Sequence, residues 1–453
     1  MVIPGSERFS RLRERYAEFI YHGFEQELMP SGVRAAFRFS VPGLAEFTPA
    51  WEFTLPENVP PKALPPALLF SLGLAELPSY WKAACPPVIR VECGTLTPKA
   101  VLFWKKLFRL GLGEFFYTNG IRPPDELVSF DFTSSPCPEY AKRELFTERA
   151  LVPIGGGKDS VVSLELLRDK AEIYPYLINP IPAALRIAAE AGLGNRGVIT
   201  RRVISPELLR LNSEGCLNGH TPFSAVVAFS SLISAYLTQS AYVVLSNEQS
   251  ACEPTVAGTD INHQYSKSLD FERDFRAHER EHIGCGADYF SLLRPLTELQ
   301  IARRFARVGR YVPIFRSCNA GGARDEWCGR CAKCLFVYII LSPFLPYGEL
   351  AACFGKDMLA DVSLGETLDK LTGTLDEKPF DCVGRRDETR LALRLLAARL
   401  ADENIAPPAL LARFLSSAVA TRENESESEL LGGFSDEHCI PERWLATAKE
   451  ALL

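Results

Sequence analysis

The chain has 453 residues, 47% of them hydrophobic and 23% charged, which is typical of a soluble globular protein with two or three domains. Its formal net charge of −6 argues against a large nucleic-acid-binding surface, and no apolar run of about 20 residues predicts a transmembrane helix. The first residues show no apolar signal-peptide segment, and with 13 cysteines we expect a reducing, cytoplasmic location.

Residues 1–140 are expected to form an N-terminal α+β module. A polar amphipathic pattern predicts a helix over residues 6–27. Alternating apolar and polar side chains predict strands over residues 37–41 and 51–55. Residues 100–112 indicate a helix with one apolar face.

Strand and helix patterns alternate over residues 141–345, as in an α/β domain with a parallel sheet. Ligands bind beyond the carboxyl ends of the strands in such sheets, so the polar segments that follow three predicted strands should converge. The predicted strands are 149–154, 172–180, 197–204 and 241–245, the apolar helix is 223–237, and the polar segments are 155–160, 178–180 and 246–250.

Residues 346–453 predict a mostly helical C-terminal region. Residues 385–400 are clearly amphipathic and indicate one of its helices. Residues 422–429 are acidic and poor in apolar side chains, which favours a solvated loop.

A glycine turn separates the strand that ends near Ile154 from the helix that begins at Lys158. Backbone N–H groups converge at such a turn, the helix dipole adds about half a positive charge, and glycines let phosphates approach closely. Lys158 can add a positive charge, and Asp159 can hold Mg²⁺ against the phosphates. Residues 155–160 are therefore predicted to bind a nucleotide.

This loop does not fit the Walker motif, because Val152 stands where the first glycine would be and Asp159 follows the lysine. It resembles the PP-loop of the ATP pyrophosphatases, usually Ser-Gly-Gly-x-Asp-Ser. That family implies that ATP is cleaved to pyrophosphate while a substrate oxygen attacks the α-phosphorus. Gly155 replaces the usual serine, and an ordinary strand-to-helix turn is the alternative. The matching residues are Gly155, Gly156, Gly157, Lys158, Asp159 and Ser160.

Cys318, Cys328, Cys331 and Cys334 have a spacing that can close a tetrahedral zinc site. The arrangement resembles the zinc loop of cyano-deazaguanine synthase, another PP-loop enzyme, and we expect structural zinc. An iron–sulfur cluster, a redox pair of Cys328 with Cys331, and reduced cysteines without a metal are the alternatives.

His278 and His282 spell the zinc-protease motif His-Glu-x-x-His, but a charged helical run precedes them, and we interpret the match as chance. His220 lies in a loop bounded by glycine and proline, where a histidine has no packing role. Residues 262–268 form a second polar loop. For both loops, substrate contact and plain solvent exposure stay open.

Four strings together resemble the UDP-N-acetyl-α-D-muramoyl-L-alanyl-L-glutamate epimerases of peptidoglycan synthesis: residues 152–160, 246–250, 262–268 and 327–338. The resemblance implies ATP-dependent inversion of the terminal L-Glu of UDP-MurNAc-L-Ala-L-Glu through a carboxyl-adenylate, with release of AMP and pyrophosphate. The N-terminal module is then expected to hold the UDP-MurNAc portion, and no nucleic acid or membrane partner is expected. The candidates for the epimerising acid and base are His220, His263, Tyr265, Lys267 and Cys252.

Two other hypotheses remain at this point. A PP-loop enzyme could adenylate a different acceptor, such as a deazapurine acid or a base in tRNA, although the acidic charge balance disfavours RNA. The chain could also be a nucleotide-binding zinc protein without catalysis, against which the intact Lys158, Asp159 and Ser160 argue.

Overall fold

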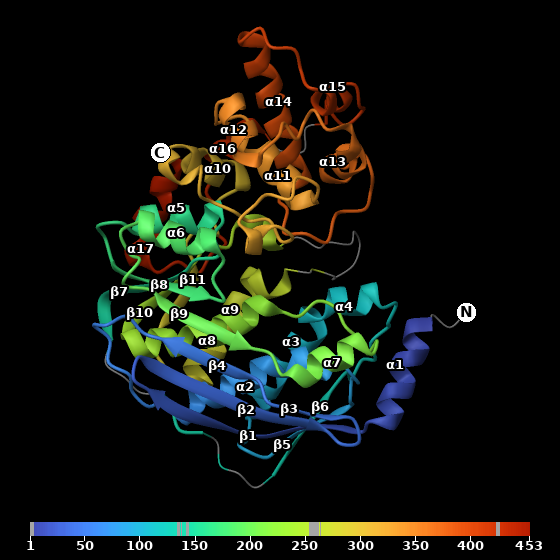
Figure 1. The fold of residues 1–453 in the computed structure, drawn as a ribbon, viewed down its shortest axis with the longest axis vertical. Helices are drawn as coiled ribbons and strands as arrows, with labels where there is room; N and C mark the ends of the chain where they lie inside the picture. Colours follow the sequence, from blue (N-terminus) through green and yellow to red (C-terminus); the bar gives the residue numbers. More distant parts are fainter. Residues whose placement is uncertain are drawn as a thin grey trace. The chain divides into compact units, whose positions relative to one another are not determined.

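The computed structural model describes residues 4–133, 136, 138–141, 145–252, 262, 264–422 and 426–453 (Figure 1). The chain divides into two compact units, each assembled from separate segments. The first unit contains Met1–Leu151, Asn195–Val243 and Thr259–Tyr289, and the second contains Val152–Gly194, Val244–Gly258 and Phe290–Leu453.

A mixed β-sheet is the frame of the first unit, with strand order β6-β5-β1-β2-β4-β9 and with β3 paired to β2. The strands β1, β5 and β6 pair in parallel, whereas β1–β2, β2–β3, β2–β4 and β4–β9 are antiparallel. The bounds are β1 (Glu18–Met29), β2 (Gly32–Val41), β3 (Ala45–Phe47), β4 (Ala50–Thr54), β5 (Val88–Val91), β6 (Ser129–Phe132) and β9 (Val198–Val203).

Two further strands, β7 (Phe146–Pro153) and β10 (Ser240–Leu245), also pair in parallel. The prediction of an α/β protein is therefore confirmed, and the sheet is mixed rather than purely parallel. The remaining strands are β8 (Glu172–Ile178) and β11 (Asp288–Ser291).

The predicted helix over residues 6–27 is wrong beyond its first half. Helix α1 ends at Arg15, and β1 begins at Glu18. Phe19 and Tyr21 are fully buried, and Phe24 pairs with Phe37 of β2. Pairing with β2 buries these aromatic side chains, and this tertiary gain overrides the local helical pattern.

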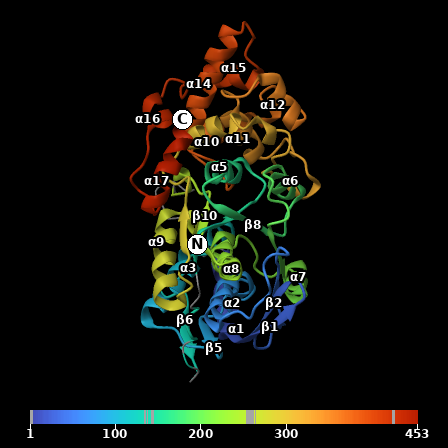
Figure 2. The same ribbon diagram turned by 90° about the vertical axis from the view of Figure 1, so that its left-hand side faces the viewer.

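Helices α2 and α8 are apolar on nearly all sides and pack against each other in the first unit (Figure 2). Glu76 of α2 is fully buried and pairs with Arg202 of β9 at 2.6 Å, so one ion pair ties the helix to the sheet. The helices of this unit are α1 (Pro4–Arg15), α2 (Pro66–Trp81), α3 (Pro98–Gly111), α4 (Gly113–Thr118), α7 (Pro206–Ser213), α8 (Phe223–Thr238) and α9 (Leu269–His278).

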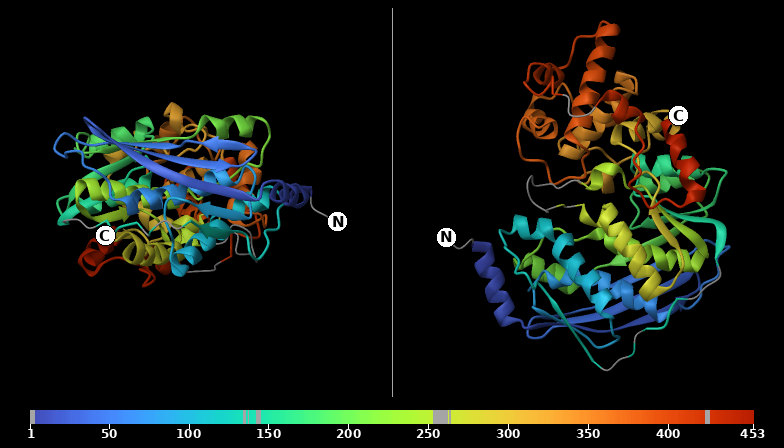
Figure 3. Two further views of the ribbon diagram at one scale, coloured as in Figure 1. Left: turned by 90° about the horizontal axis from the view of Figure 1, so that it is seen from below. Right: turned by 180° about the vertical axis from the view of Figure 1, so that it is seen from behind.

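The second unit is built largely from helices, and its C-terminal part is drawn in orange and red in Figure 3. The apolar α11 packs against α10, α13 and α14. This agrees with the helical C-terminal region that the sequence predicts. Its helices are α5 (Lys158–Leu167), α6 (Pro182–Glu190), α10 (Glu298–Ala306), α11 (Ala332–Leu341), α12 (Tyr347–Phe354), α13 (Gly365–Thr372), α14 (Arg386–Asp402), α15 (Ala409–Leu415), α16 (Glu427–Gly432) and α17 (Glu442–Lys449).

The acidic segment 422–429 is not a loop throughout, because α16 begins at Glu427. The side chain of Ser426 accepts a hydrogen bond from the Glu429 N–H, and the glutamate caps Ser426 in return. The side chain of Leu430 in α16 is buried, and the local composition did not predict this. Residues 423–425 lie outside the described part. Among the described residues, no helix is long and apolar enough to cross a membrane.

Candidate active site

Three polar segments that follow strands meet in the second unit, as the sequence predicted. The Ile154 N–H donates to the Tyr176 carbonyl at 2.9 Å, which joins the ends of β7 and β8. A Cβ on Gly156 would lie 3.1 Å from Ile181, just beyond the 178–180 segment. Ser246, at the start of the third segment, donates to Ser163 of α5 at 2.8 Å.

The glycine loop between β7 and α5 has a backbone that only glycine adopts freely. Gly156 has φ +95°, and a Cβ there would lie 3.0 Å from the Arg316 carbonyl. Gly157 stands at the N-cap of α5 and offers no side chain to the first N–H groups of the helix. Those donors and the helix dipole therefore suit an anion, and Gly155 borders open space.

Lys158 begins α5 with its ammonium turned toward two carboxylates. Its Nζ lies 2.5 Å from Oδ1 of Asp159 and 2.5 Å from Oε2 of Glu298. The side chains of Lys158 and Glu298 are 5% and 7% exposed, whereas that of Asp159 is 34% exposed. Burial alone would lower the pKa of Lys158, but the two carboxylates outweigh burial and raise it, so the ammonium stays charged.

Glu298, which contacts Lys158 of the site, and the residues that hold Glu298 were not predicted from the sequence. Glu298 opens α10, whose N-cap Thr297 forms a capping box with Gln300. The Glu298 N–H donates to Oε1 of Glu388 at 3.0 Å, and burial is the main cause that raises the pKa of both carboxyl groups. The capping pattern of α10 can be recognised in the sequence. The contact of Glu298 with Lys158, 140 positions away in the chain, cannot.

His220 lies in the first unit, where the side chains of Glu114 and Lys82 contact its loop. Its Nδ1 lies 3.2 Å from Oε2 of Glu114. Lys82 donates to the carbonyls of Gly219 and His220 and, at 2.7 Å, to the hydroxyl of Thr221. Burial is the main cause that lowers the pKa of Lys82 to about 8. Neither Lys82 nor Glu114 was singled out from the sequence, because both lie in apolar helical surroundings.

The other acid and base candidates are distributed over separate elements. Tyr265 and Lys267 share one 3₁₀ turn of the first unit, and Tyr265 packs edge-on against Phe271. Burial is the main cause that raises the pKa of Tyr265, so its phenol stays protonated near neutral pH. Cys252 belongs to the second unit, where Arg294 donates to its sulfur at 3.7 Å. His263 lies outside the described residues.

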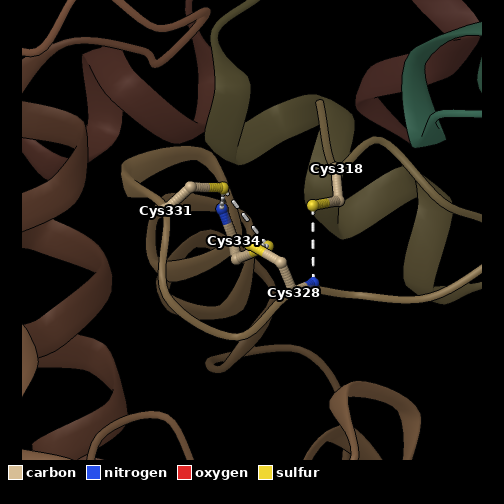
Figure 4. A group of neighbouring side chains, drawn as sticks. All are labelled: Cys318, Cys328, Cys331 and Cys334. Atoms are coloured by element: carbon tan, nitrogen blue, oxygen red, sulfur yellow. Dashed lines mark hydrogen bonds between the residues drawn. The ribbon is translucent and has the colours of Figure 1, made fainter. Parts of the chain in front are cut away.

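Cys318, Cys328, Cys331 and Cys334 gather at the start of α11 with their sulfur atoms within 4.8 Å of one another (Figure 4). A zinc–sulfur bond of about 2.3 Å puts the sulfurs of a tetrahedral site about 3.8 Å apart. Cys334 lies 3.7 Å from Cys328 and 3.5 Å from Cys331, which suits one ion better than a cluster of several irons. The hydrogen bond between Cys331 and Cys334 lowers the pKa of Cys331 to about 5 and raises that of Cys334.

The four-cysteine turn is joined directly to the glycine loop. The Arg316 N–H, two residues before Cys318, donates to the Gly156 carbonyl at 2.8 Å. The N–H groups of Gly321 and Cys328 donate to the Cys318 sulfur at 3.2 and 3.4 Å. A backbone hydrogen bond therefore links the segment before the turn to the glycine loop, a link that the sequence did not suggest.

His278 and His282 of the His-Glu-x-x-His string are built into aromatic packing. The ring of His278 stacks on Phe103 with centroids 4.3 Å apart and meets Trp104 edge-on. Burial is the main cause that lowers the pKa of His278 to about 3, so the ring is neutral. The chain changes to a π-helix at Glu279–Ile283, directly after His278, and His282 lies within it.

Fold and site together define an α/β protein with a glycine loop at a helix start, hydrogen-bonded to the segment that leads into a four-cysteine turn. Two family models match the sequence: the MurL N-terminal domain over residues 10–292 and the MurL C-terminal domain over residues 314–429. The chain belongs to the MurL family.

Similar proteins bear the name UDP-N-acetyl-alpha-D-muramoyl-L-alanyl-L-glutamate epimerase. One from Salinispora tropica is 40% identical over 329 residues, which cover 70% of this chain and 70% of the relative. One from Xanthomonas oryzae pv. oryzae is 36% identical over 373 residues, which cover 80% of this chain and 81% of the relative. The resemblance inferred from the four sequence strings is confirmed.

Proposed function

We propose that this protein inverts the terminal L-Glu of UDP-MurNAc-L-Ala-L-Glu to D-Glu, using ATP and releasing AMP and pyrophosphate. The observation that carries the proposal is the family match over most of the chain, with relatives named for epimerisation of this compound. The helix-start anion loop supplies the reason for ATP.

In the first step, a terminal carboxylate oxygen of the substrate attacks the α-phosphorus of ATP, and pyrophosphate leaves. The N–H groups of residues 155–160 would hold the phosphates, and Asp159, which is partly exposed, would hold Mg²⁺, which neutralises phosphate charge. The new acyl-phosphate bond removes the carboxylate charge, so that the adjacent Cα–H becomes acidic enough for a side-chain base.

In the second step, a base takes the Cα proton and an acid returns a proton to the opposite face. Water then cleaves the acyl-adenylate and gives AMP and the free carboxylate. We take His220 as the base, because Glu114 lies beside its Nδ1 as a carboxylate does beside a catalytic histidine. Tyr265, whose phenol stays protonated, suits the acid, while Lys267, Cys252 and His263 remain candidates.

The four cysteines would hold a structural Zn²⁺ that keeps the 316–334 segment against the loop. The first unit would contribute the contacts to the UDP-MurNAc portion. The protein would then act on a small molecule in the cytoplasm.

The test is incubation of the protein with ATP, Mg²⁺ and UDP-MurNAc-L-Ala-L-Glu in deuterated water. We expect AMP, pyrophosphate and a product with D-Glu that carries deuterium at Cα. Intact ATP and unchanged L-Glu would overturn the proposal, and deazapurine acids and tRNA would be the next acceptors.

The base is tested with His220→Gln in the same assay. The variant should still release pyrophosphate but should exchange the Cα proton about 10²- to 10⁴-fold more slowly. Wild-type exchange in this variant would move the role to another candidate. Arg210→Gln, at an exposed side chain of helix α7, is a control that should leave both steps unchanged.

A further inference from the structure

A continuous series of polar contacts runs from the C-terminal helices to the glycine loop within the second unit. Glu388 of α14 accepts from the Glu298 N–H at 3.0 Å, and its other oxygen accepts from the Arg385 N–H at 3.2 Å. Glu298 contacts Lys158, and Lys158 contacts Asp159. Space around Glu298 is full, because a Cβ on Gly384 would lie 2.8 Å from its Cγ.

The exposure of these side chains changes stepwise along the series. Glu388 is fully buried, Glu298 and Lys158 are nearly so, and Asp159 is the first with a third of its surface open. Lys158 therefore presents its charge to Asp159 and Glu298 in the interior rather than to solvent. The carboxylate of Asp159 is held on one side and open on the other.

Stability alone does not explain a buried lysine and glutamate at this place. A buried ion pair usually contributes little, because desolvation offsets the attraction, and apolar residues of equal volume often serve as well. What the pair does provide is a fixed position for Lys158, and so for the carboxylate beside it.

We propose that Glu298 is a positioning residue for Mg²⁺: it holds Lys158, and Lys158 holds the Asp159 carboxylate toward the metal that accompanies the ATP phosphates. The inference rests on the proposed function, since it takes the glycine loop as the ATP site. Glu298 itself touches neither the metal nor the nucleotide in this scheme. Its effect on the reaction passes through Lys158 alone.

The test is calorimetric titration of the full-length protein with ATP at a series of Mg²⁺ concentrations, which does not require turnover. Wild type should bind ATP more tightly as Mg²⁺ rises. Glu298→Gln keeps the size and one acceptor oxygen but loses the charge, and should need at least about tenfold more Mg²⁺ for the same gain. Asp159→Asn should show a loss at least as large.

The double variant Glu298→Gln, Asp159→Asn decides whether Glu298 acts through Asp159. We expect it to match Asp159→Asn alone, because residues that act in series are not additive. Multiplied effects would overturn the inference, as would an unchanged Mg²⁺ dependence in Glu298→Gln. Absence of ATP binding in wild type would instead overturn the proposed function and the inference with it.

Two further variants control for misfolding and for a general effect of removing a buried carboxylate. The double variant Lys158→Met, Glu298→Gln leaves no unpaired buried charge, and it can therefore be used if Glu298→Gln alone fails to fold. Its ATP affinity should also no longer depend on Mg²⁺. Glu165→Gln is the matched control, because Glu165 lies on the same helix, is mostly buried and pairs with Arg168 at 2.6 Å. It should bind ATP with the Mg²⁺ dependence of wild type.

Discussion

Two buried lysines of this protein have opposite electrostatic surroundings. Lys158 in the second unit lies between two carboxylates, and its pKa is raised although burial opposes this. Lys82 in the first unit donates to two carbonyls and a hydroxyl, and burial lowers its pKa to about 8. Their burial is nearly equal, with Lys158 and Lys82 each 4% exposed.

The comparison shows that the partners, and not the burial, decide what a buried charge does. A lysine between carboxylates is a permanent cation that can hold an anion in place. A lysine among neutral acceptors is a hydrogen-bond donor that can give up its proton within reach of neutral pH. The first suits the loop proposed for ATP, and the second suits the framework of a loop that carries His220.

The largest expected effect concerns the four clustered cysteines Cys318, Cys328, Cys331 and Cys334. Their thiolates need a cation, just as the Lys158 ammonium needs its two carboxylates. Metal analysis should find one zinc per chain. Structural zinc contributes about 10–16 kcal/mol in small fingers, as much as the whole stability of a typical domain. Cys328→Ser should therefore lose the zinc and fail to fold stably by circular dichroism. Cys353→Ser, outside the cluster, should keep both metal and fold, and a zinc-free but stable wild type would contradict this prediction.

Removal of the Lys158 cation should be the next largest effect. Lys158→Met leaves Glu298 buried without a partner, which costs about 3–5 kcal/mol of unfolding free energy. Addition of Glu298→Gln should recover most of this loss. Urea denaturation of wild type, both single variants and the double variant gives the coupling energy. Additive losses would mean that the pair does not behave as a unit.

Lys82→Met should cost less, because it leaves neutral acceptors rather than a charge unpaired, about 1–3 kcal/mol. The pH dependence of the stability loss distinguishes the Lys82 variant from the Lys158 variant. The folded protein releases the Lys82 proton near pH 8 and the unfolded chain near 10.5, so between these values the unfolded state binds more protons and wild-type stability rises with pH. The loss in Lys82→Met should therefore grow from pH 8 to pH 10. A loss that is constant over this range would show that the Lys82 pKa is not lowered.

The smallest effect concerns Glu388, where burial raises the pKa to about 8 from 4.5. Between these values the folded protein holds a proton that the unfolded chain has released, so this group makes stability fall as pH rises, by at most about 1.4 kcal/mol per pH unit. Urea unfolding at pH 6, 7 and 8 should show a shallower fall for Glu388→Gln than for wild type. Glu403→Gln, exposed near the other end of α14, should keep the wild-type slope.

Much of this protein could be predicted from local patterns in the sequence. A glycine turn before Lys158, the spacing of four cysteines and the apolar run of α8 each express a rule that acts within one turn or one element. The convergence of the polar strand ends also followed, since it is a general property of such sheets. The family resemblance rested on the same short strings.

Only the tertiary structure decided the features that join distant segments. Residues 18–29 became a strand because β2 buries their aromatic side chains, and no local pattern carries that information. Glu298 meets Lys158 from 140 positions away, and Lys82 meets the His220 loop from a similar separation. A charge inside a protein is stable only with its partners, and those partners are chosen by the fold rather than by the neighbouring sequence.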